Sequence, residues 1–313
     1  MIQWTQPYQT SGVHTLFMSI AIIVHGGAGT IAPERIEGAR KGCKEASAIG
    51  WNVLQSGGTA LAAVEAAVRS LEDNPLYDAG TGSYLSLGGK IEMDAGMMEG
   101  HTLQVGSIAG IELIKNPISL ARQVLESPHV LLVGKGAQQF AQERGISLCE
   151  LKDLLTEYQH ERWKAARKAL DEGKLQEGEK HGTVGAVAID SQGHLAAATS
   201  TGGIFNKYPG RVGDSPLVGC GYYADEDAAV SCTGDGEDFI RLLIAKRASD
   251  FVAGGMNAQE AAEAAINVLG ARASGTGGLI IVDRRGNIGF AHNTRHMSRA
   301  YMQEGMQEPT AAS

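Results

Sequence analysis

The order of strand-like and helix-like segments is the feature that most constrains the fold of this chain. Short apolar runs predict strands at 19–25, 102–114, 129–133, 183–190, 194–201 and 227–234, and two hairpins are predicted at 83–100 and 277–293. Helical spacing of apolar residues predicts helices at 33–55, 59–73, 119–126, 136–145, 150–172, 237–252 and 258–269. These elements come in blocks and not in strict alternation, which favours an α+β fold of packed layers over a doubly wound parallel sheet.

The composition is typical of a globular protein with a sizeable core. The chain has 313 residues, of which 43% are hydrophobic and 20% are charged. Its formal net charge of −8 argues against binding to nucleic acid, which requires a basic surface. The four cysteines are far apart and form no Cys-x-x-Cys pair. A zinc ribbon or a disulfide framework is therefore not expected, and a reducing compartment is favoured.

Residues 1–18 do not have the pattern of a signal peptide. They contain no Lys or Arg and no continuous apolar stretch, unlike a signal peptide. We expect them to be a disordered extension, or to lie upstream of a true start at Met18. Because no run approaches the roughly 20 apolar residues that span a bilayer, the sequence predicts a cytoplasmic protein without a membrane partner.

The segment 173–182 contains almost no apolar residue and is the best linker in the sequence. It ends at Gly182, and an apolar alternating strand begins at once with Thr183. A threonine hydroxyl is a poor nucleophile without a base beside it, and one available base is the residue's own α-amino group, whose pKa of about 7.7–8.0 is near neutrality. That group becomes free only when the bond before Thr183 is cut. A loose linker tolerates such a cut, and glycine leaves room at the scissile carbonyl.

Two further threonines occur next to glycines at the ends of predicted strands. Thr201 lies in ATSTGG, and Thr233 precedes Gly234 in SCTGDG. A single threonine at such a position is common in strands and before turns, and is by itself no evidence of catalysis. Only their combination with Thr183 indicates catalysis.

Other familiar signatures are incomplete. The run HGGAGTIA lacks the third glycine of a dinucleotide-binding fingerprint. The run GDSPL has Leu217 where a nucleophile elbow has glycine. His292 and His296 are four residues apart, but no glutamate follows the first, so a metal site there is not expected.

Five motifs, in the same order along the chain, resemble the plant-type asparaginase and isoaspartyl peptidase family of N-terminal-nucleophile hydrolases: HGGAGT, LEDNPLYDAGTG, GTVGAVAID, ATSTGGIFNKYPGRVGDSP and SCTGDGE. The similarity extends from about residue 20 to about residue 300. It implies a four-layer αββα sandwich, which agrees with the block-like order of the elements. It also implies that the precursor cuts itself between Gly182 and Thr183. The α chain would comprise residues 19–182 and the β chain residues 183–313; together they would form one folded domain, and two such αβ units a dimer.

The resemblance also implies the roles of several residues. The freed Thr183 would attack the side-chain carbonyl of the substrate, with its own amino group as base, and form a covalent acyl-enzyme. Thr201 would position the Thr183 hydroxyl by a hydrogen bond. Thr233 and the N–H of Gly234 would form the oxyanion hole, where donors directed at developing charge contribute most to the rate.

A second group of residues would bind the substrate. Arg211 would hold the α-carboxylate, and Asp214, together with the Gly236 carbonyl, would hold the α-amino group. An ordinary exposed ion pair between Arg211 and Asp214 would contribute little to stability, whereas opposite charges in a glycine-rich loop match a zwitterionic amino acid. The implied substrates are small molecules, namely β-aspartyl (isoaspartyl) dipeptides and L-asparagine.

The loop 71–81 resembles the family's sodium loop, which holds the ion through main-chain carbonyls. The corresponding residues are Leu71, Glu72, Asn74, Tyr77, Ala79 and Thr81. The sodium ion would be structural, and no cofactor would be required for the chemistry. Two residues depart from the family pattern, since Asp78 stands where asparagine is usual and Asp235 where histidine is common. Both departures concern specificity and the pH optimum, not the reaction class.

Three alternative functions stay open from the sequence. A glycosylasparaginase would share GRVGDSP and TGDG, but it typically has His-Asp-Thr at the cleavage site and is secretory, whereas this chain has His-Gly-Thr. A threonine aspartase of the taspase type would share TVGAV, but it lacks the aspartate that binds a free amino group, so Asp214 argues against it. A non-catalytic binding protein on the same scaffold would lack one of Thr183, Thr201 and Thr233, and all three are present.

Overall fold

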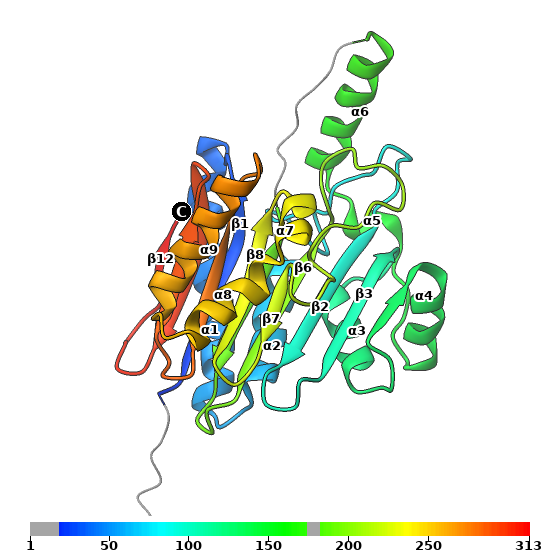
Figure 1. The fold of residues 1–313 in the computed structure, drawn as a ribbon. Helices are drawn as coiled ribbons and strands as arrows, with labels where there is room; N and C mark the ends of the chain where they lie inside the picture. Colours follow the sequence, from blue (N-terminus) through cyan, green and yellow to red (C-terminus); the bar gives the residue numbers. More distant parts are fainter. Residues whose placement is uncertain (1–18, 174–181) are drawn as a thin grey trace, which may run out of the picture.

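Two β-sheets and the helices that pack on them give the chain a mixed α+β fold (Figure 1). The computed structural model describes residues 19–173 and 182–313, so the expected extension at 1–18 and most of the expected linker, 174–181, lie outside the described residues. Within the described residues, one sheet has the strand order β12-β11-β1-β5-β6-β2-β3-β4 and the other the order β10-β9-β8-β7. Neighbouring strands are antiparallel, with the exception of β3 and β4.

The strands of the larger sheet are β1 Ala21–Gly29, β2 Met93–Glu99, β3 Val105–Ile111, β4 Leu131–Val133, β5 Val184–Ile189, β6 Leu195–Thr201, β11 His296–Gln303 and β12 Thr310–Ala312. The strands of the smaller sheet are β7 Tyr222–Ala224, β8 Ala228–Gly234, β9 Gly277–Asp283 and β10 Ile288–His292. The helices are α1 Pro33–Gln55, α2 Ala60–Glu72, α3 Pro117–Leu125, α4 Gly134–Glu143, α5 Leu151–Leu154, α6 Glu157–Asp171, α7 Gly236–Leu242, α8 Ile244–Ala253 and α9 Ala258–Arg272.

Helices pack on each sheet, and the two sheets pack on each other. On the larger sheet, α1 contacts β1 and β11, α2 contacts β5 and β6, and α3 contacts β2 and β3. On the smaller sheet, α8 contacts β8, and α9 contacts β9 and β10. Between the sheets, β1 contacts β9, and both β5 and β6 contact β8. Three apolar clusters result, one under each set of helices and one between the sheets.

The alternation of side chains in β1 shows how both faces of the larger sheet are buried. Ile22 and Val24 belong to the cluster under the helices, whereas Ala21 and Ile23 belong to the cluster between the sheets. Because successive side chains point to opposite faces of a strand, a strand covered on both faces has a continuous apolar run. The next inward-facing position is His25, which hydrogen-bonds to β8 of the other sheet.

Local sequence signals explain where three of the helices begin. Pro33 stands in the first turn of α1, where a backbone N–H would have no hydrogen-bond partner within the helix, so its absence costs nothing. The Thr59 side chain accepts a hydrogen bond from the Ala62 N–H (3.2 Å) and caps α2, as predicted. In α9, Asn257 and Glu260 form a capping box. These three helices follow the predicted ranges within a few residues.

The predicted hairpin over 83–100 is wrong. Residues 83–92 form no strand, and β2 pairs with β3 and β6 instead. The Tyr84 N–H donates to the Asp78 carboxylate (2.7 Å), and a Cβ on Gly89 would lie 3.2 Å from the Trp163 ring. Contacts with other segments therefore take the place of strand pairing in this stretch.

Two predicted helices are each divided in two. The helix at 237–252 is interrupted at Leu243, which has a left-handed conformation (φ 52°), and the first N–H groups of α8 bind the carbonyls of Gly219 and Cys220. The helix at 150–172 is interrupted at Leu155, and α6 starts afresh with Thr156 as its N-cap. In both places the second helix has its own hydrogen-bond partners for the N–H groups that a helix start exposes.

The strands β7, β11 and β12 were not among the predicted elements. In β11, Ser298 and Arg299 interrupt the apolar alternation that would mark a strand. Arg299 occupies a strand position because its guanidinium packs over the Phe290 ring of β10, 4.0 Å from the centroid. The strands β7 and β12 have three residues each, too few for a periodic signal.

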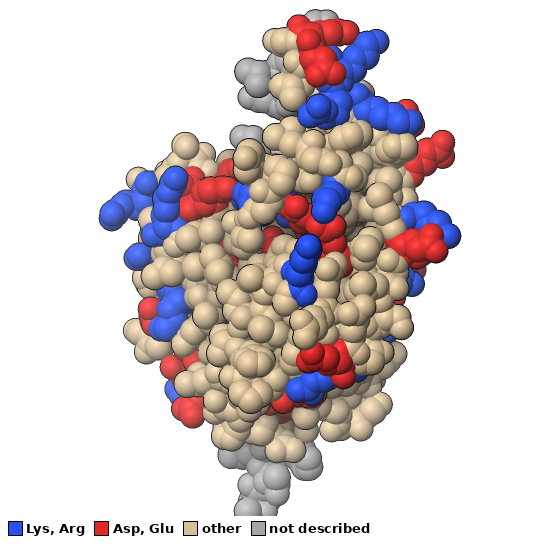
Figure 2. Space-filling view, turned by 90° about the vertical axis from the view of Figure 1, so that its right-hand side faces the viewer, with Lys and Arg blue, Asp and Glu red and all other residues tan. Residues whose placement is uncertain are grey.

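Charged side chains are interspersed on the face of the molecule drawn in Figure 2. Acidic and basic residues lie next to one another there, around a broad area without charge, and no continuous basic surface occupies this face. None of the helices in the described part of the chain is long and apolar enough to cross a membrane.

Candidate active site

Thr183 and Thr201 lie opposite each other on neighbouring strands. Thr183 immediately precedes β5, and Thr201 ends β6. The pairing of Val184 with Ser200 places the two threonines side by side, on the face that is turned toward the smaller sheet. Thr183 Oγ1 donates to Thr201 Oγ1 at 3.1 Å, and both residues are buried. The structure thus brings the expected nucleophile and its expected hydrogen-bond partner into contact.

The glycine run in β1 connects Thr183 with Thr233. The register of β1 shifts between His25 and Ala28, and Gly27 has a left-handed conformation (φ 100°). A Cβ on Gly27 would lie 3.3 Å from Gly182 Cα and 3.5 Å from the Thr183 carbonyl oxygen, so the two segments are in close contact. The next N–H, of Ala28, donates to Thr233 Oγ1 at 3.4 Å. Thr183 and Thr233 therefore both contact one short segment of β1, and Thr201 contacts Thr183.

Gly234 and Asp235 form the turn between β8 and α7. A Cβ on Gly234 would lie 2.5 Å from the Phe239 ring and 2.6 Å from the Thr276 carbonyl oxygen, so a side chain does not fit there. Asp235 Oδ2 accepts from the Thr276 N–H (2.7 Å). The Asp235 side chain, one of the two departures from the family pattern, thus joins this turn to the segment that leads into β9.

Asp78, the other departure, joins the predicted cleavage site to the residue that follows Thr201. Its N–H donates to the Gly182 carbonyl (3.3 Å), and its own carbonyl accepts from the Gly202 N–H (2.8 Å). Oδ1 accepts from the Tyr84 N–H, whereas Oδ2 is buried and has no hydrogen-bond partner among the described residues. Burial raises the pKa of the Asp78 carboxyl well above its usual range. A Cβ on Gly182 would lie 2.3 Å from Asp78 Cβ, which leaves no room for a side chain.

Arg211, Asp214 and Gly236 come together as the sequence analysis expects. A Cβ on Gly236 would lie 2.9 Å from Asp214 Oδ1 and 3.0 Å from Arg211 Nη2. The Arg211 guanidinium also lies against Gly213, whose Cβ would be 2.9 Å from Nη1. The two glycines therefore allow the planar guanidinium to lie flat against the backbone.

Glu237 belongs to this group, although no sequence argument gave it a role. Arg211 donates from Nε (2.9 Å) and Nη2 (2.8 Å) to the two oxygens of Glu237. This hydrogen bonding lowers the pKa of Glu237. A guanidinium has five N–H donors, so the end formed by Nη1 and Nη2 keeps donors for a second carboxylate. The only sequence signal was the place of Glu237 at the end of the motif SCTGDGE.

Asp214 is a buried acid with an unused oxygen. Its Oδ2 has no hydrogen-bond partner among the described residues. Burial raises the pKa of Asp214 to about 7, despite the opposing effect of Arg211. An ammonium group would be a suitable partner, because it would stabilise the ionised form and satisfy the free oxygen.

A second polar layer lies one step deeper between the sheets. His25 Nε2 is 3.0 Å from Ser231 Oγ, Ser231 Oγ is 2.6 Å from Thr199 Oγ1, and Thr199 Oγ1 donates to the Gly221 carbonyl (3.2 Å). Burial lowers the pKa of His25 to about 3, so the ring is neutral. Ser231 and Thr199 stand two residues before Thr233 and Thr201, and this layer therefore joins the strands that carry both threonines. In the sequence, His25, Thr199 and Ser231 are single polar residues within apolar strands, and no pattern predicts that they form a common layer.

In the loop proposed for sodium, two glycines lie in close contact with main-chain carbonyl oxygens. Gly80 and Gly82 have left-handed conformations, and their Cβ atoms would lie 2.6 Å from the Glu72 carbonyl oxygen and 2.7 Å from the Tyr77 carbonyl oxygen. The Glu72 carbonyl also accepts from the Thr81 N–H (2.8 Å). No group of His, Cys, Asp and Glu side chains in the described ranges could hold a metal ion.

The comparisons with known proteins cover almost the whole chain. The family model described as asparaginase matches residues 18–311. A plant-type L-asparaginase of Pyrococcus horikoshii is 51% identical over 308 residues, which cover 93% of this chain and 99% of that protein. A plant-type L-asparaginase of Thermococcus kodakarensis is 51% identical with the same shares covered. An isoaspartyl peptidase/L-asparaginase of Bos taurus is 42% identical over 291 residues, or 92% of this chain and 94% of that protein.

Proposed function

Because the chain belongs to the asparaginase family, we propose that it is an isoaspartyl peptidase and L-asparaginase that uses Thr183 as its nucleophile. The observation that carries the proposal is that Thr183, the residue directly after Gly182, has its Oγ1 3.1 Å from Thr201 Oγ1. The substrates would be β-aspartyl dipeptides and L-asparagine. Their acyl part would be held by Arg211 and Asp214.

The first reaction would be cleavage of the chain itself. Thr183 Oγ attacks the Gly182 carbonyl, an ester forms between them, and the peptide C–N bond breaks while the nitrogen takes up a proton. Water then hydrolyses the ester and leaves the α-amino group of Thr183 free. The Asp78 N–H already donates to the Gly182 oxygen (3.3 Å), where it would stabilise the negative charge that develops on that oxygen.

The second reaction would use the freed amino group as base. It accepts the Thr183 hydroxyl proton as Oγ attacks the side-chain carbonyl of the aspartyl unit, and it gives that proton to the leaving amine. The aspartyl ester on Oγ is then hydrolysed by water to aspartate. Thr233 and the N–H of Gly234 would stabilise the oxyanion in both steps, and Thr201 would position Oγ.

The pair of Arg211 and Asp214 would decide which aspartyl compounds react. L-Asparagine and β-aspartyl dipeptides both have a free α-carboxylate and a free α-amino group on the aspartyl unit. An α-linked aspartyl peptide has no free α-carboxylate there, so part of the Arg211 guanidinium would stay unpaired. Because Glu237 already pairs with Arg211, the α-linked isomer would lose only the charge-assisted hydrogen bonds to the remaining donors, about 1.5–3 kcal/mol. It should therefore be hydrolysed at least about tenfold more slowly.

Further features of the family are part of the same proposal. The packing of helices on both sheets supports a four-layer αββα sandwich of the N-terminal-nucleophile type. The resemblance of residues 71–81 to the family's sodium loop supports a structural Na⁺ held by their main-chain carbonyls, whose role would be to fix the loop that carries Asp78. The chemistry itself would need no cofactor. The free cysteines support a reducing, cytoplasmic location, and we expect a dimer of processed αβ units.

Mass spectrometry of the purified protein tests self-cleavage. The expected pieces are residues 1–182 and 183–313, before any trimming of the linker, and Thr183→Ala should stay intact. Cleavage of that variant at the same bond without added protease would refute the mechanism. The substrate class is tested by incubating processed enzyme with Asp-Leu in its α and β linkages, and comparable rates on both would refute the clamp of Arg211 and Asp214.

A further inference from the structure

Arg35 is a half-buried arginine that has no acidic partner. It lies at the start of α1, where Nη2 donates to the Leu76 carbonyl (2.7 Å) and the guanidinium stacks over the Tyr158 ring (4.5 Å to the centroid). No Asp or Glu in the ranges 19–173 and 182–313 forms an ion pair with it. Since arginine keeps its charge under all ordinary conditions and offers five donors, a partly desolvated guanidinium without a counter-charge is suited to binding an anion.

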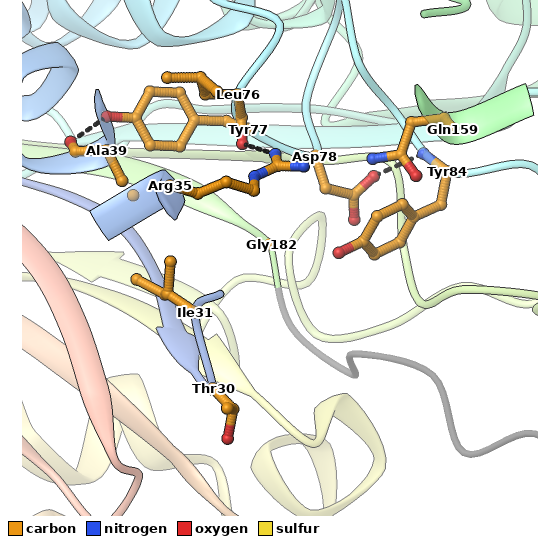
Figure 3. A pocket seen from close by; sticks show the side chains of 11 residues that line it. Thr30, Ile31, Arg35, Ala39, Leu76, Tyr77, Asp78, Tyr84, Gln159 and Gly182 are labelled. Atoms are coloured by element: carbon orange, nitrogen blue, oxygen red, sulfur yellow. Dashed lines mark hydrogen bonds between the residues drawn. The ribbon is translucent and has the colours of Figure 1, made fainter. Parts of the chain in front are cut away.

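The Arg35 side chain lines a small cavity beside the predicted cleavage site. The cavity has a volume of about 50 Å³, and its walls include Arg35, Asp78, Tyr84, Gln159 and Gly182. Figure 3 shows the guanidinium directed toward Asp78 and the space beside Gly182, with Tyr84 on the opposite side. Since about 10–15 Å³ of such volume is enough to hold one water molecule, the cavity has room for a group the size of a carboxylate.

A second arginine lies over an aromatic ring of the cavity wall, that of Tyr84. The Arg162 guanidinium is 5.3 Å from the centroid of the Tyr84 ring and 5.6 Å from that of Tyr158, the ring on which Arg35 also stacks. Asp78, the acidic residue in the wall, forms no ion pair with Arg35 in the described structure. Both guanidinium groups stack on the Tyr158 ring, which places positive charge near the cavity.

The chemistry of Thr183 indicates which part of a substrate would lie on this side. The α-amino group that protonates the leaving amine is the nitrogen that Gly182 acylates in the uncut chain. The leaving residue must approach that nitrogen, and it therefore extends to the side that Gly182 occupies. The acyl part lies on the other side, at Arg211, Asp214 and Gly236.

We propose that Arg35 binds the α-carboxylate of the leaving residue, so that this enzyme prefers β-aspartyl dipeptides with a free C-terminus. The inference rests on the proposed function and adds a second carboxylate site to it. It makes Arg35 a specificity-determining residue. Arg35 does not act on the reacting atoms.

A purely structural role of Arg35 would have a different signature. Its bond to the Leu76 carbonyl joins α1 to the loop that carries Asp78. Loss of this bond alone would affect every substrate to the same extent. The readout is therefore a ratio of kcat/KM values for two substrates that differ only in the carboxylate.

The experiment compares β-aspartyl-leucine with β-aspartyl-leucinamide, which lacks the carboxylate, on the processed wild-type enzyme. Charge-assisted hydrogen bonds of this kind favour the acid by about tenfold or more in kcat/KM. In Arg35→Gln the ratio should fall to about one. The matched control is Arg40→Gln, which changes an exposed arginine of the same helix that pairs with Glu37, and it should keep the wild-type ratio.

Each outcome decides the inference. A wild-type ratio near one, or an unchanged ratio in Arg35→Gln, overturns the inference about Arg35. In either case, hydrolysis of both compounds would still support the proposed function. If wild type hydrolyses neither compound nor L-asparagine, the proposed function fails and the inference falls with it. If Arg35→Gln does not fold or process, Arg35→Lys replaces it. Lysine keeps the charge but not the planar fork, so the ratio should then be intermediate, and a full wild-type ratio would again refute the proposal.

Discussion

Replacing Gly182 by alanine should slow self-cleavage without removing any reacting group. The added Cβ would lie 2.3 Å from Asp78 Cβ, about 1 Å less than ordinary van der Waals contact. Either Asp78 or the Gly182 carbonyl must then move by about this amount, and the hydrogen bond from the Asp78 N–H to that carbonyl would be lost or bent. A displacement of 1 Å at a reacting centre can cost about 100-fold in rate, which corresponds to about 2.7 kcal/mol in the barrier.

The assay follows freshly made protein over time by mass spectrometry and counts the fraction that is cut before Thr183. Gly136→Ala is the control, because a Cβ there meets nothing within 4 Å. Asp78→Gly in the background of Gly182→Ala should recover part of the rate, since it removes the clashing Cβ and keeps the main-chain N–H. Cleavage of Gly182→Ala at the wild-type rate, or no recovery in the double variant, would show that this contact does not set the geometry of the scissile bond.

Four further predictions concern the processed enzyme and the fold. Thr233→Ala and Thr201→Ala should fold but lose activity, by about 100- to 1,000-fold for an oxyanion donor, and normal turnover of processed Thr233→Ala would remove that residue from the oxyanion hole. Burial raises the pKa of Asp214 to about 7, and the reaction needs both the ionised Asp214 and the unprotonated α-amino group of Thr183, so log kcat/KM should fall with a slope of about two as the pH drops below about 7. In Asp214→Asn this slope should approach about one, and an unchanged slope would contradict the assignment. Glu237→Gln should raise KM more than it lowers kcat, because Arg211 loses its bidentate partner (2.9 and 2.8 Å); steady-state kinetics that show only a fall in kcat would refute this. Gly96→Ala should lower the free energy of unfolding by about 1–3 kcal/mol in denaturant titrations, since its Cβ would lie 2.2 Å from the Tyr222 ring, and an unchanged midpoint would contradict the packing argument.

The sequence was informative where a local rule decides the structure. Thr59 caps α2 because its hydroxyl stands just before the helix and accepts a hydrogen bond from the N–H of Ala62, which has no partner within the helix. The threonines could be singled out because each stands at a strand end next to glycine, and the structure places Thr183 and Thr201 in contact. The nucleophilic role of Thr183 was predicted from the linker before it and from its own α-amino group. The roles of Thr201 and Thr233 came from the family resemblance, and all three roles stay predictions.

The sequence was uninformative where tertiary contacts decide. Nothing in the run 83–92 shows that Asp78 will bind the N–H of Tyr84 and prevent a hairpin. The break at Leu243 depends on the carbonyls of Gly219 and Cys220, which bind the first N–H groups of α8. Glu237 could not be recognised as the partner of Arg211, because an acidic residue at the start of a helix is common for electrostatic reasons alone.

The strand order of the larger sheet bears on what a cut at Gly182 would do to the molecule. β1 comes before that point in the chain, yet it pairs with β11 on one side and β5 on the other, and both of these come after it. β2, also before the cut, pairs with β6, which is after it. The two pieces would thus be interleaved by backbone hydrogen bonds and could not separate while folded. Once unfolded, however, they would have to find each other again by diffusion. Recovery of a processed enzyme after heating should therefore depend on protein concentration, whereas recovery of uncut Thr183→Ala should not.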